Sequence, residues 1–329
     1  MTSPTTTRQD ATAAGGADRS EPFVLIAAAD GLHHGSRPAE QLVGRSVTAV
    51  TATDPTAAWA LVDGSDVVRV TPDGTEDVAR LTDGRGLCIH EHHGTVFVGG
   101  KDARLWRLEG GDLVRVASFD EAPTRDQWTT PWGGPPDVFS MASHGDDLYV
   151  SVHVGGILHS DDDGQTWQAT IDLHDDVHQV VTDDAGTVWA ATGRRGLARS
   201  TDKGRTWQYL ADGLHATYLL AVAVTGAGVL VSAQSGHAGS DTAVYLFDGD
   251  HFEPVRGLPV PLSGISSRHM AARGSHGVLV TDDGSIYLSQ DGGHTWCTQR
   301  RQTLSVDWSL PTNPTPGLSS VRWMRTDHS

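Results

Sequence analysis

The sequence predicts an all-β protein built from many short strands, and three observations support this. Glycine is abundant, with 38 copies among 329 residues, and aromatic residues make up only 6% of the chain, yet ten of them are Trp. The apolar stretches are of strand length and are separated by turn residues. Because glycine lies well above its usual share of about 7% and adopts the positive φ angles of tight turns, we expect short strands joined by tight turns.

One octapeptide pattern, Ser-x-Asp-x-Gly-x-Thr-Trp, occurs three times. We call its copies boxes; they span residues 160–167, 200–207 and 289–296. The first two begin 40 residues apart, which is the length of a four-stranded propeller blade. The third begins 89 residues after the second, which leaves room for one blade without a box. This spacing predicts a β-propeller.

The other strands follow from the apolar pattern between the boxes. Innermost strands are expected at 137–143, 177–182, 219–224 and 265–271, and second strands at 148–152, 188–191, 229–233 and 278–281. The same pattern of apolar strands separated by turns extends back to about residue 46, which makes six complete blades. Residues 23–43 have enough chain for three further strands and residues 318–324 for one. We therefore expect a seven-bladed β-propeller of four-stranded antiparallel blades, closed by a C-terminal strand that joins the N-terminal blade, because closure removes open sheet edges.

The boxes resemble the Asp-box of the bacterial neuraminidase repeat, which occurs in sialidases and in many other propellers. Residues 22–329 as a whole resemble a bacterial group of single-domain Asp-box propellers labelled sialidase-like or repeat-containing. The resemblance implies that each box lies between the third and fourth strands of its blade, on the face away from the ligand site. It also implies a structural box, in which Ser and Asp bond backbone amides and Trp packs between blades.

Activity does not transfer with this fold. Sialidases of this kind carry an Arg triad, a Tyr-Glu nucleophile pair and an Arg-Ile-Pro tripeptide in the first blade. Here the first blades lack that tripeptide, and Tyr209, Tyr218 and Tyr245 have no convincing Glu partner, so sialidase activity is not expected. Other Asp-box propellers are the photosystem II assembly factors, which are non-catalytic scaffolds, and xyloglucan hydrolases, which use Asp pairs on two propellers.

The rest of the chain bounds its partners and location. Residues 1–21 contain no apolar run and are expected to form a disordered tail, which leaves residues 22–329 as a single propeller domain. The formal net charge of −17 disfavours nucleic acid and anionic membrane surfaces, and no apolar stretch approaches the roughly 20 residues of a membrane helix. Cys88 and Cys297 lie far apart, so no disulfide framework is indicated. We expect a cytoplasmic monomer.

Histidine, with 17 copies, supplies the candidate site at the channel mouth, where innermost strands begin and second strands end. His153 ends a second strand, His178 and His269 open innermost strands, and His215 precedes one. We expect His153, His178 and His215 to share a metal ion, with His269 as a fourth ligand. Such imidazoles favour copper or iron, and zinc also fits. The alternative is that each imidazole bonds a backbone carbonyl in the channel wall.

Three further residues complete the candidate site. Asp176 lies just before the strand of His178, where it could orient a ligated imidazole or act as a general base. Trp128 and Trp132 lie in a Gly/Pro-rich loop ahead of a strand, and we expect them to stack on a substrate at the rim of the channel. The pair of His92 and His93, by contrast, precedes a glycine and is typical of a turn.

Two functions from different classes follow. The first is a histidine-ligated, metal-dependent enzyme, with oxidoreductase chemistry favoured, that acts on a small-molecule substrate at the channel mouth. The second is a non-catalytic propeller scaffold that binds a peptide or protein on the same face. The number of His residues at strand ends favours the enzyme, whereas the absence of a compact catalytic motif favours the scaffold.

Overall fold

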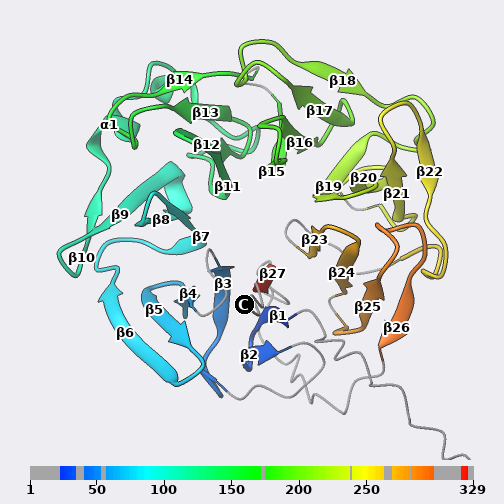
Figure 1. Ribbon diagram of the computed structural model, residues 1–329. Helices are drawn as coiled ribbons and strands as arrows, with labels where there is room; N and C mark the ends of the chain where they lie inside the picture. Colours follow the sequence, from blue (N-terminus) through cyan, green and yellow to red (C-terminus); the bar gives the residue numbers. More distant parts are fainter. Residues whose placement is uncertain are drawn as a thin grey trace, which may run out of the picture.

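The protein is a β-propeller, as the sequence predicts. The computed structural model describes residues 23–34, 41–52, 57–171, 175–237, 239–262, 269–281, 283–299 and 320–324; the expected tail at residues 1–21 lies outside the described residues. Antiparallel sheets are arranged around a central axis, with the first strand of each four-stranded blade innermost (Figure 1). None of the helices among the described residues is long and apolar enough to cross a membrane.

Six blades have four antiparallel strands each, whose order in space follows their order in the chain. The first three blades consist of β3 (Val47–Ala52), β4 (Ala58–Val62), β5 (Asp66–Thr71) and β6 (Gly74–Arg80); β7 (Gly86–His92), β8 (Thr95–Gly100), β9 (Arg104–Glu109) and β10 (Asp112–Arg115); and β11 (Val138–His144), β12 (Asp147–Val152), β13 (Gly156–Ser160) and β14 (Gln168–Ala169). The next three consist of β15 (Val177–Thr182), β16 (Val188–Thr192), β17 (Leu197–Ser200) and β18 (Gln208–Leu210); β19 (Tyr218–Thr225), β20 (Gly228–Gln234), β21 (Ala243–Phe247) and β22 (Phe252–Pro254); and β23 (Met270–Arg273), β24 (His276–Val280), β25 (Ile286–Ser289) and β26 (Cys297–Gln299). Short helical turns η1 (Lys101–Ala103), α1 (Ala117–Asp120) and η2 (Arg125–Gln127) lie in the connections around β9 and β10.

The remaining sheet has three strands, in the order β2 (Gly31–His34), β1 (Phe23–Ala28) and β27 (Ser320–Met324). The two ends of the chain therefore meet in one sheet, since β27 pairs antiparallel with β1. The expectation of three N-terminal strands is corrected to two among the described residues: Gln41 forms only an isolated bridge to Leu32. The reason is local, because Leu42 and Gly44 both adopt positive φ angles and turn the chain towards β3.

The three boxes fold as the same turn, between the third and fourth strands of their blades. In each box the Ser hydroxyl donates to the Asp carboxylate and accepts from the Gly N–H, while the Thr N–H and hydroxyl both donate to the same carboxylate. These distances are 2.6–2.9 Å in all three copies. The recurring sequence thus satisfies the polar groups of a tight turn locally.

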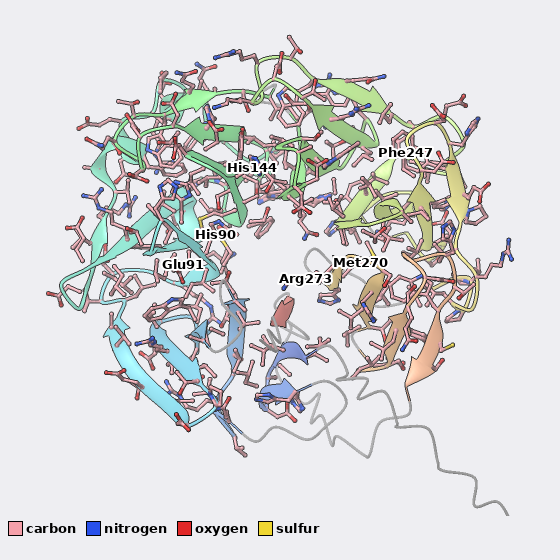
Figure 2. All side chains as sticks on the ribbon, viewed as in Figure 1. His90, Glu91, His144, Phe247, Met270 and Arg273 are labelled. Atoms are coloured by element: carbon pink, nitrogen blue, oxygen red, sulfur yellow. The ribbon has the colours of Figure 1, made fainter. Side chains whose placement is uncertain are left out.

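Apolar side chains fill the space between neighbouring blades. The box residues Trp167 and Trp296 are buried, whereas Trp207 is only partly buried and donates its indole N–H to Thr170 O. The blades approach so closely that a Cβ on Gly99 of β8 would lie 2.4 Å from Val138 of β11. Figure 2 shows side chains packed within the blades and between neighbouring blades around the ring. Gly99, on the second strand of its blade, therefore permits tight packing against the next blade.

The two faces of the propeller differ in what they carry. The mouth face contains the start of each innermost strand and the end of each second strand, as in the pairing of Val138 with Val152. The opposite face, which we call the box face, contains the end of each innermost strand, because Leu148 pairs with both Ser143 and Ser160 at the first residue of a box. The box turns therefore lie at the opposite ends of the strands from the predicted site.

The box carboxylates should make stability depend on pH. Hydrogen bonds from Thr206 lower the pKa of Asp202 to about 2; burial alone would raise the pKa of Asp291, but hydrogen bonds from Thr295 outweigh it and lower that pKa to about 2. Because an unfolded Asp titrates near 3.9, this stabilisation is present above about pH 4 and is lost as pH falls towards about 2. The double variant Asp202→Asn, Asp291→Asn should show a smaller fall of Tm across this range in a thermal melt, whereas the exposed control Asp161→Asn should follow the wild type.

Candidate metal centre

Three of the predicted residues meet at the mouth face, on two neighbouring blades. His153 directly follows β12, and its N–H donates to Asp137 O at 2.9 Å. Asp176 directly precedes β15. His178 is the extra residue of a β-bulge, because the pairing of β15 with β16 shifts between Val177 and Gln179. A bulge re-aims the side chain it carries, and here that side chain faces Asp176.

The donor atoms of these residues are close together. The Nε2 of His153 lies 2.7 Å from Asp176 Oδ1, and the Nε2 of His178 lies 3.2 Å from Asp176 Oδ2. One donor atom of each residue lies within 4.8 Å of the other two. Ligand bonds of about 2.0–2.2 Å place neighbouring donors about 3–4 Å apart. The distances between the three donor atoms are therefore close to those expected around one metal ion.

The tautomer of His178 is determined by its backbone partner. Its Nδ1 lies 2.5 Å from Leu219 O, and a carbonyl only accepts, so Nδ1 carries the hydrogen. In a neutral imidazole Nε2 then carries a lone pair, and this lone pair faces Oδ2 of Asp176. His178 Nε2 and Asp176 Oδ2 are then both hydrogen-bond acceptors and lie 3.2 Å apart, so they need a cation or a second proton between them. The expected carbonyl contact in the channel wall is thus present at Nδ1 and leaves Nε2 available to a metal.

Asp176 is charged and incompletely satisfied. Its buried Oδ1 has no hydrogen-bond partner among the described residues, although His153 Nε2 lies only 2.7 Å from it. Burial alone would raise the pKa of this carboxyl, but the adjacent imidazoles of His153 and His178 outweigh it and hold the pKa well below its usual range. Asp176 was predicted as a catalytic group; the structure places it between two imidazoles, as a third donor.

Aromatic rings surround the cluster. The ring of Trp132, which is 72% exposed, lies 5.7 Å from the His153 ring, and Phe139 lies 5.0 Å from it. Tyr218 lies 4.8 Å from His178. Burial, together with the nearby carboxylate of Asp176, raises the pKa of Tyr218 to about 12, so its hydroxyl stays protonated at neutral pH. Tyr218 and Phe139 were not singled out from the sequence, although Phe139 occupies the bulge of β11 that matches the bulge of His178.

Trp128, the other ring expected to stack on a substrate, is a core residue. Its side chain is buried, 5.3 Å from the Phe119 ring, and its indole N–H donates to Thr124 Oγ1. The guanidinium of Arg125 covers it. Since no ligand can stack on a ring enclosed in this way, Trp132 is the ring that the structure places at the cluster.

His215 and His269 do not belong to this group of donors in the described part of the chain. The Nδ1 of His215 bonds Tyr245 OH at 2.9 Å, and its Nε2 lies 3.5 Å from Asp241. His269 is buried just before β23, where its carbonyl accepts from Val280 N–H. Of the four imidazoles expected to share an ion, the structure brings together only those of His153 and His178, and the carboxylate of Asp176 lies between them.

Comparison with known proteins establishes the fold. No family model and no curated protein matches the sequence. Among solved structures, YCF48 bound to D1 peptide is similar, with a TM-score of 0.56 at 15% identity, over 79% of this chain and 83% of that one. Virginiamycin B lyase from Staphylococcus aureus is similar too, with a TM-score of 0.56 at 13% identity, over 79% and 85% of the chains.

A third similar structure is an ancestral GH74 enzyme, with a TM-score of 0.57 at 15% identity. The match covers 88% of this chain but only 41% of the GH74 chain, so the present protein spans less than half the length of that enzyme. Propellers of this shape thus include both enzymes and a peptide-bound protein. At these identities the likeness concerns the fold alone.

Proposed function

We propose that the protein is a metal-dependent enzyme, with oxidoreductase chemistry favoured, which acts on a small molecule at the mouth of the propeller. The observation that carries the proposal is the cluster of His153, Asp176 and His178, whose facing donors need a cation or a proton between them. Two imidazoles and one carboxylate with open positions are the ligand set of non-haem iron oxygenases. The carboxylate therefore favours iron over copper, and zinc also fits this donor set.

The residues around the cluster suggest how a substrate is held. His178 is oriented by Leu219 O, and such an outer contact fixes a ligand ring and its tautomer. Trp132 offers an exposed face for stacking, and the hydroxyl of the protonated Tyr218 lies against the carboxylate of Asp176. A bound metal would supply Lewis acidity or redox chemistry, while these side chains position the substrate beside it.

Metal analysis of protein purified without a histidine tag tests the proposal. We expect iron, copper or zinc at this cluster after loading, and its loss in Asp176→Asn and His178→Ala, with His294→Ala, an exposed box histidine, as the matched control. Metal binding should weaken at acid pH, because protons compete with the metal for the imidazole nitrogens. Equal metal content in Asp176→Asn, His178→Ala and the control would refute the assignment.

The second candidate is a scaffold that binds a peptide or protein on the mouth face. It is favoured by a pocket of 660 Å³ beside the β7–β10 blade, lined by three cationic and three anionic side chains: Arg104, Arg115, Arg125, Asp83, Asp102 and Asp120. Such a pocket suits a charged peptide. Equal metal content in the wild type and in Asp176→Asn after loading would show that the cluster of His153, Asp176 and His178 binds none, and would favour this function.

We also propose that the three-stranded sheet β2-β1-β27 serves as the seventh blade and closes the ring, and that the boxes are Asp-boxes. The pairing of β27 with β1 and the identical hydrogen bonds of the three boxes support these assignments.

A further inference from the structure

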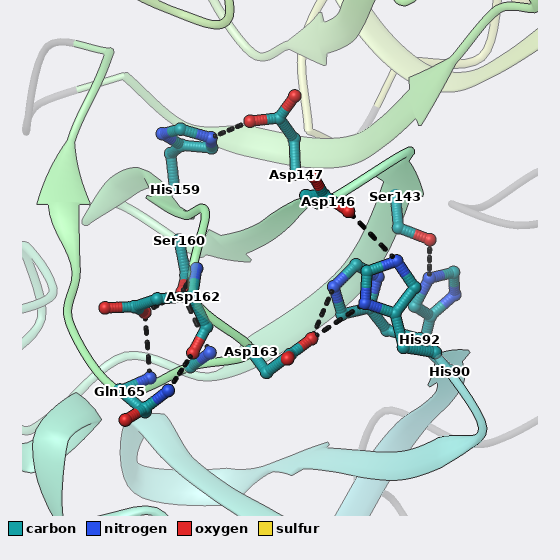
Figure 3. A network of polar contacts seen from close by, with 12 residues as sticks. His90, His92, Ser143, Asp146, Asp147, His159, Ser160, Asp162, Asp163 and Gln165 are labelled. Atoms are coloured by element: carbon teal, nitrogen blue, oxygen red, sulfur yellow. Dashed lines mark hydrogen bonds and ion pairs between the residues drawn. The ribbon is translucent and has the colours of Figure 1, made fainter.

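A second cluster of metal-type donors lies on the box face, between the β7–β10 and β11–β14 blades. His92 and His93 lie at the turn from β7 to β8. Asp163 belongs to the first box of the next blade, and Asp146 lies in the turn from β11 to β12. Figure 3 shows His92 facing Asp163, with Asp146 nearby. Three turns of two blades therefore converge on one point.

The distances are those of a compact donor group. His92 Nε2 lies 3.3 Å and His93 Nδ1 lies 2.9 Å from the same oxygen, Asp163 Oδ1. One donor atom of each of these three residues lies within 4.8 Å of the other two. His93 Nε2 lies 3.6 Å from Asp146. The two imidazole rings are stacked, with centroids 4.1 Å apart.

The buried imidazole provides a second and independent observation. The side chain of His92 is only 1% exposed, yet its Nε2 has no hydrogen-bond partner among the described residues, although it points at Asp163. A buried polar atom left without a partner is costly. Burial, and then the neighbouring His93, lower the pKa of His92. The observation that points to a ligand is the geometry, because a bound cation would satisfy the buried Nε2 that faces Asp163.

Turn chemistry does not account for Asp163. The equivalent positions of the second and third boxes hold Lys203 and Gly292, and yet all three boxes make the same hydrogen bonds through their Ser, Asp, Gly and Thr residues. The turn thus has no need of a carboxylate at this position. The carboxylate of Asp163 instead contacts the imidazoles of His92 and His93 on the preceding blade.

We propose that His92, His93 and Asp163 form a second metal site, for a zinc-type divalent transition-metal ion, with Asp146 at its edge. Two nitrogen donors and a carboxylate suit zinc, nickel or copper, whereas calcium and magnesium prefer all-oxygen sets. The ion links two neighbouring blades on the face opposite the first cluster. The bound ion stabilises the contact between these two blades, and this site does not depend on the proposed enzyme activity.

Zinc binding to the whole chain tests this site. All proteins carry Asp176→Asn, so that the first cluster contributes no zinc. We compare this background protein with variants that add Asp163→Asn, His93→Asn or the control Asp161→Asn. Asparagine suits the two tested positions because both have positive φ and asparagine tolerates that conformation. After removal of metal by a chelator, zinc chloride is added, and affinity is measured by competition with a chromophoric chelator.

We expect one equivalent of zinc in the Asp176→Asn background and in its Asp161→Asn control. Adding Asp163→Asn or His93→Asn should weaken binding by about tenfold or more, since loss of even a supporting partner of a metal ligand costs about 10–100-fold. Zinc should also raise the Tm of the background protein and have less effect on the two site variants. Absence of zinc from the background protein, or equal affinity in Asp163→Asn and Asp161→Asn, would overturn the proposal.

Discussion

Deletion of residues 318–329 is expected to lower the free energy of unfolding by on the order of 5 kcal/mol. The deleted strand β27 pairs with β1 over five residues, and a backbone hydrogen bond contributes about 1 kcal/mol net. It also packs beside the innermost strands β3 and β23, so its removal opens a sheet edge next to both. Because a domain is typically stable by only about 5–15 kcal/mol, the truncated chain should be near the limit of folding.

Urea unfolding followed by circular dichroism measures this effect. The truncated protein should have a lower midpoint and a broader transition than the wild type, because the two ends of the chain no longer share a sheet. The matched control is deletion of residues 325–329 alone, which follow β27 in the sequence, and it should unfold like the wild type. An unchanged midpoint in the longer deletion would show that the terminal strand does not hold the ring.

Replacing Trp167 by Ala is expected to lower the free energy of unfolding by about 3–5 kcal/mol, the usual effect of removing a buried aromatic ring. The ring is buried, it meets Phe119 edge-on at 5.1 Å, and its indole N–H donates to Ser118 Oγ. It thus joins the box turn to helix α1 in the connection from the preceding blade.

The matched control for this substitution is Trp132→Ala. Trp132 is 72% exposed, so the loss of its ring should change stability by no more than about 0.5 kcal/mol. Both effects are measured by equilibrium denaturation. Equal destabilisation by the two substitutions would mean that the box tryptophan does not stabilise the contact between blades.

Much of the fold and the meeting of two of the four candidate histidines were predictable from the sequence. The strand expected at residues 177–182 is β15, and each box lies between the third and fourth strands of its blade. His153 and His178 were expected to meet at the mouth, and they do lie side by side there, with ring centroids 6.1 Å apart. These features depend on the local alternation of apolar and polar residues and on the spacing of a sequence repeat, and both can be read from a single sequence.

The wrong assignments concern residues whose surroundings come from other parts of the chain. His215 was expected to share the ion but bonds Tyr245, thirty residues later. Trp128 was expected at the rim but packs on Phe119 in the core. Neither contact leaves a pattern in the residues next to it, and a loop rich in Gly and Pro looks the same whether its rings face solvent or the core.

The sequence by itself therefore determined the blade repeat, the box turns and which imidazoles stand at strand ends, because hydrogen bonds within eight residues and a period of two along each strand specify them. Only the tertiary structure decided that His178 lies in a bulge facing Asp176, that Leu219 O orients it, and that His92 meets Asp163 across two blades. Those contacts depend on the register of pairing and on how closely two blades approach, and both are set by the packing of side chains from distant parts of the chain.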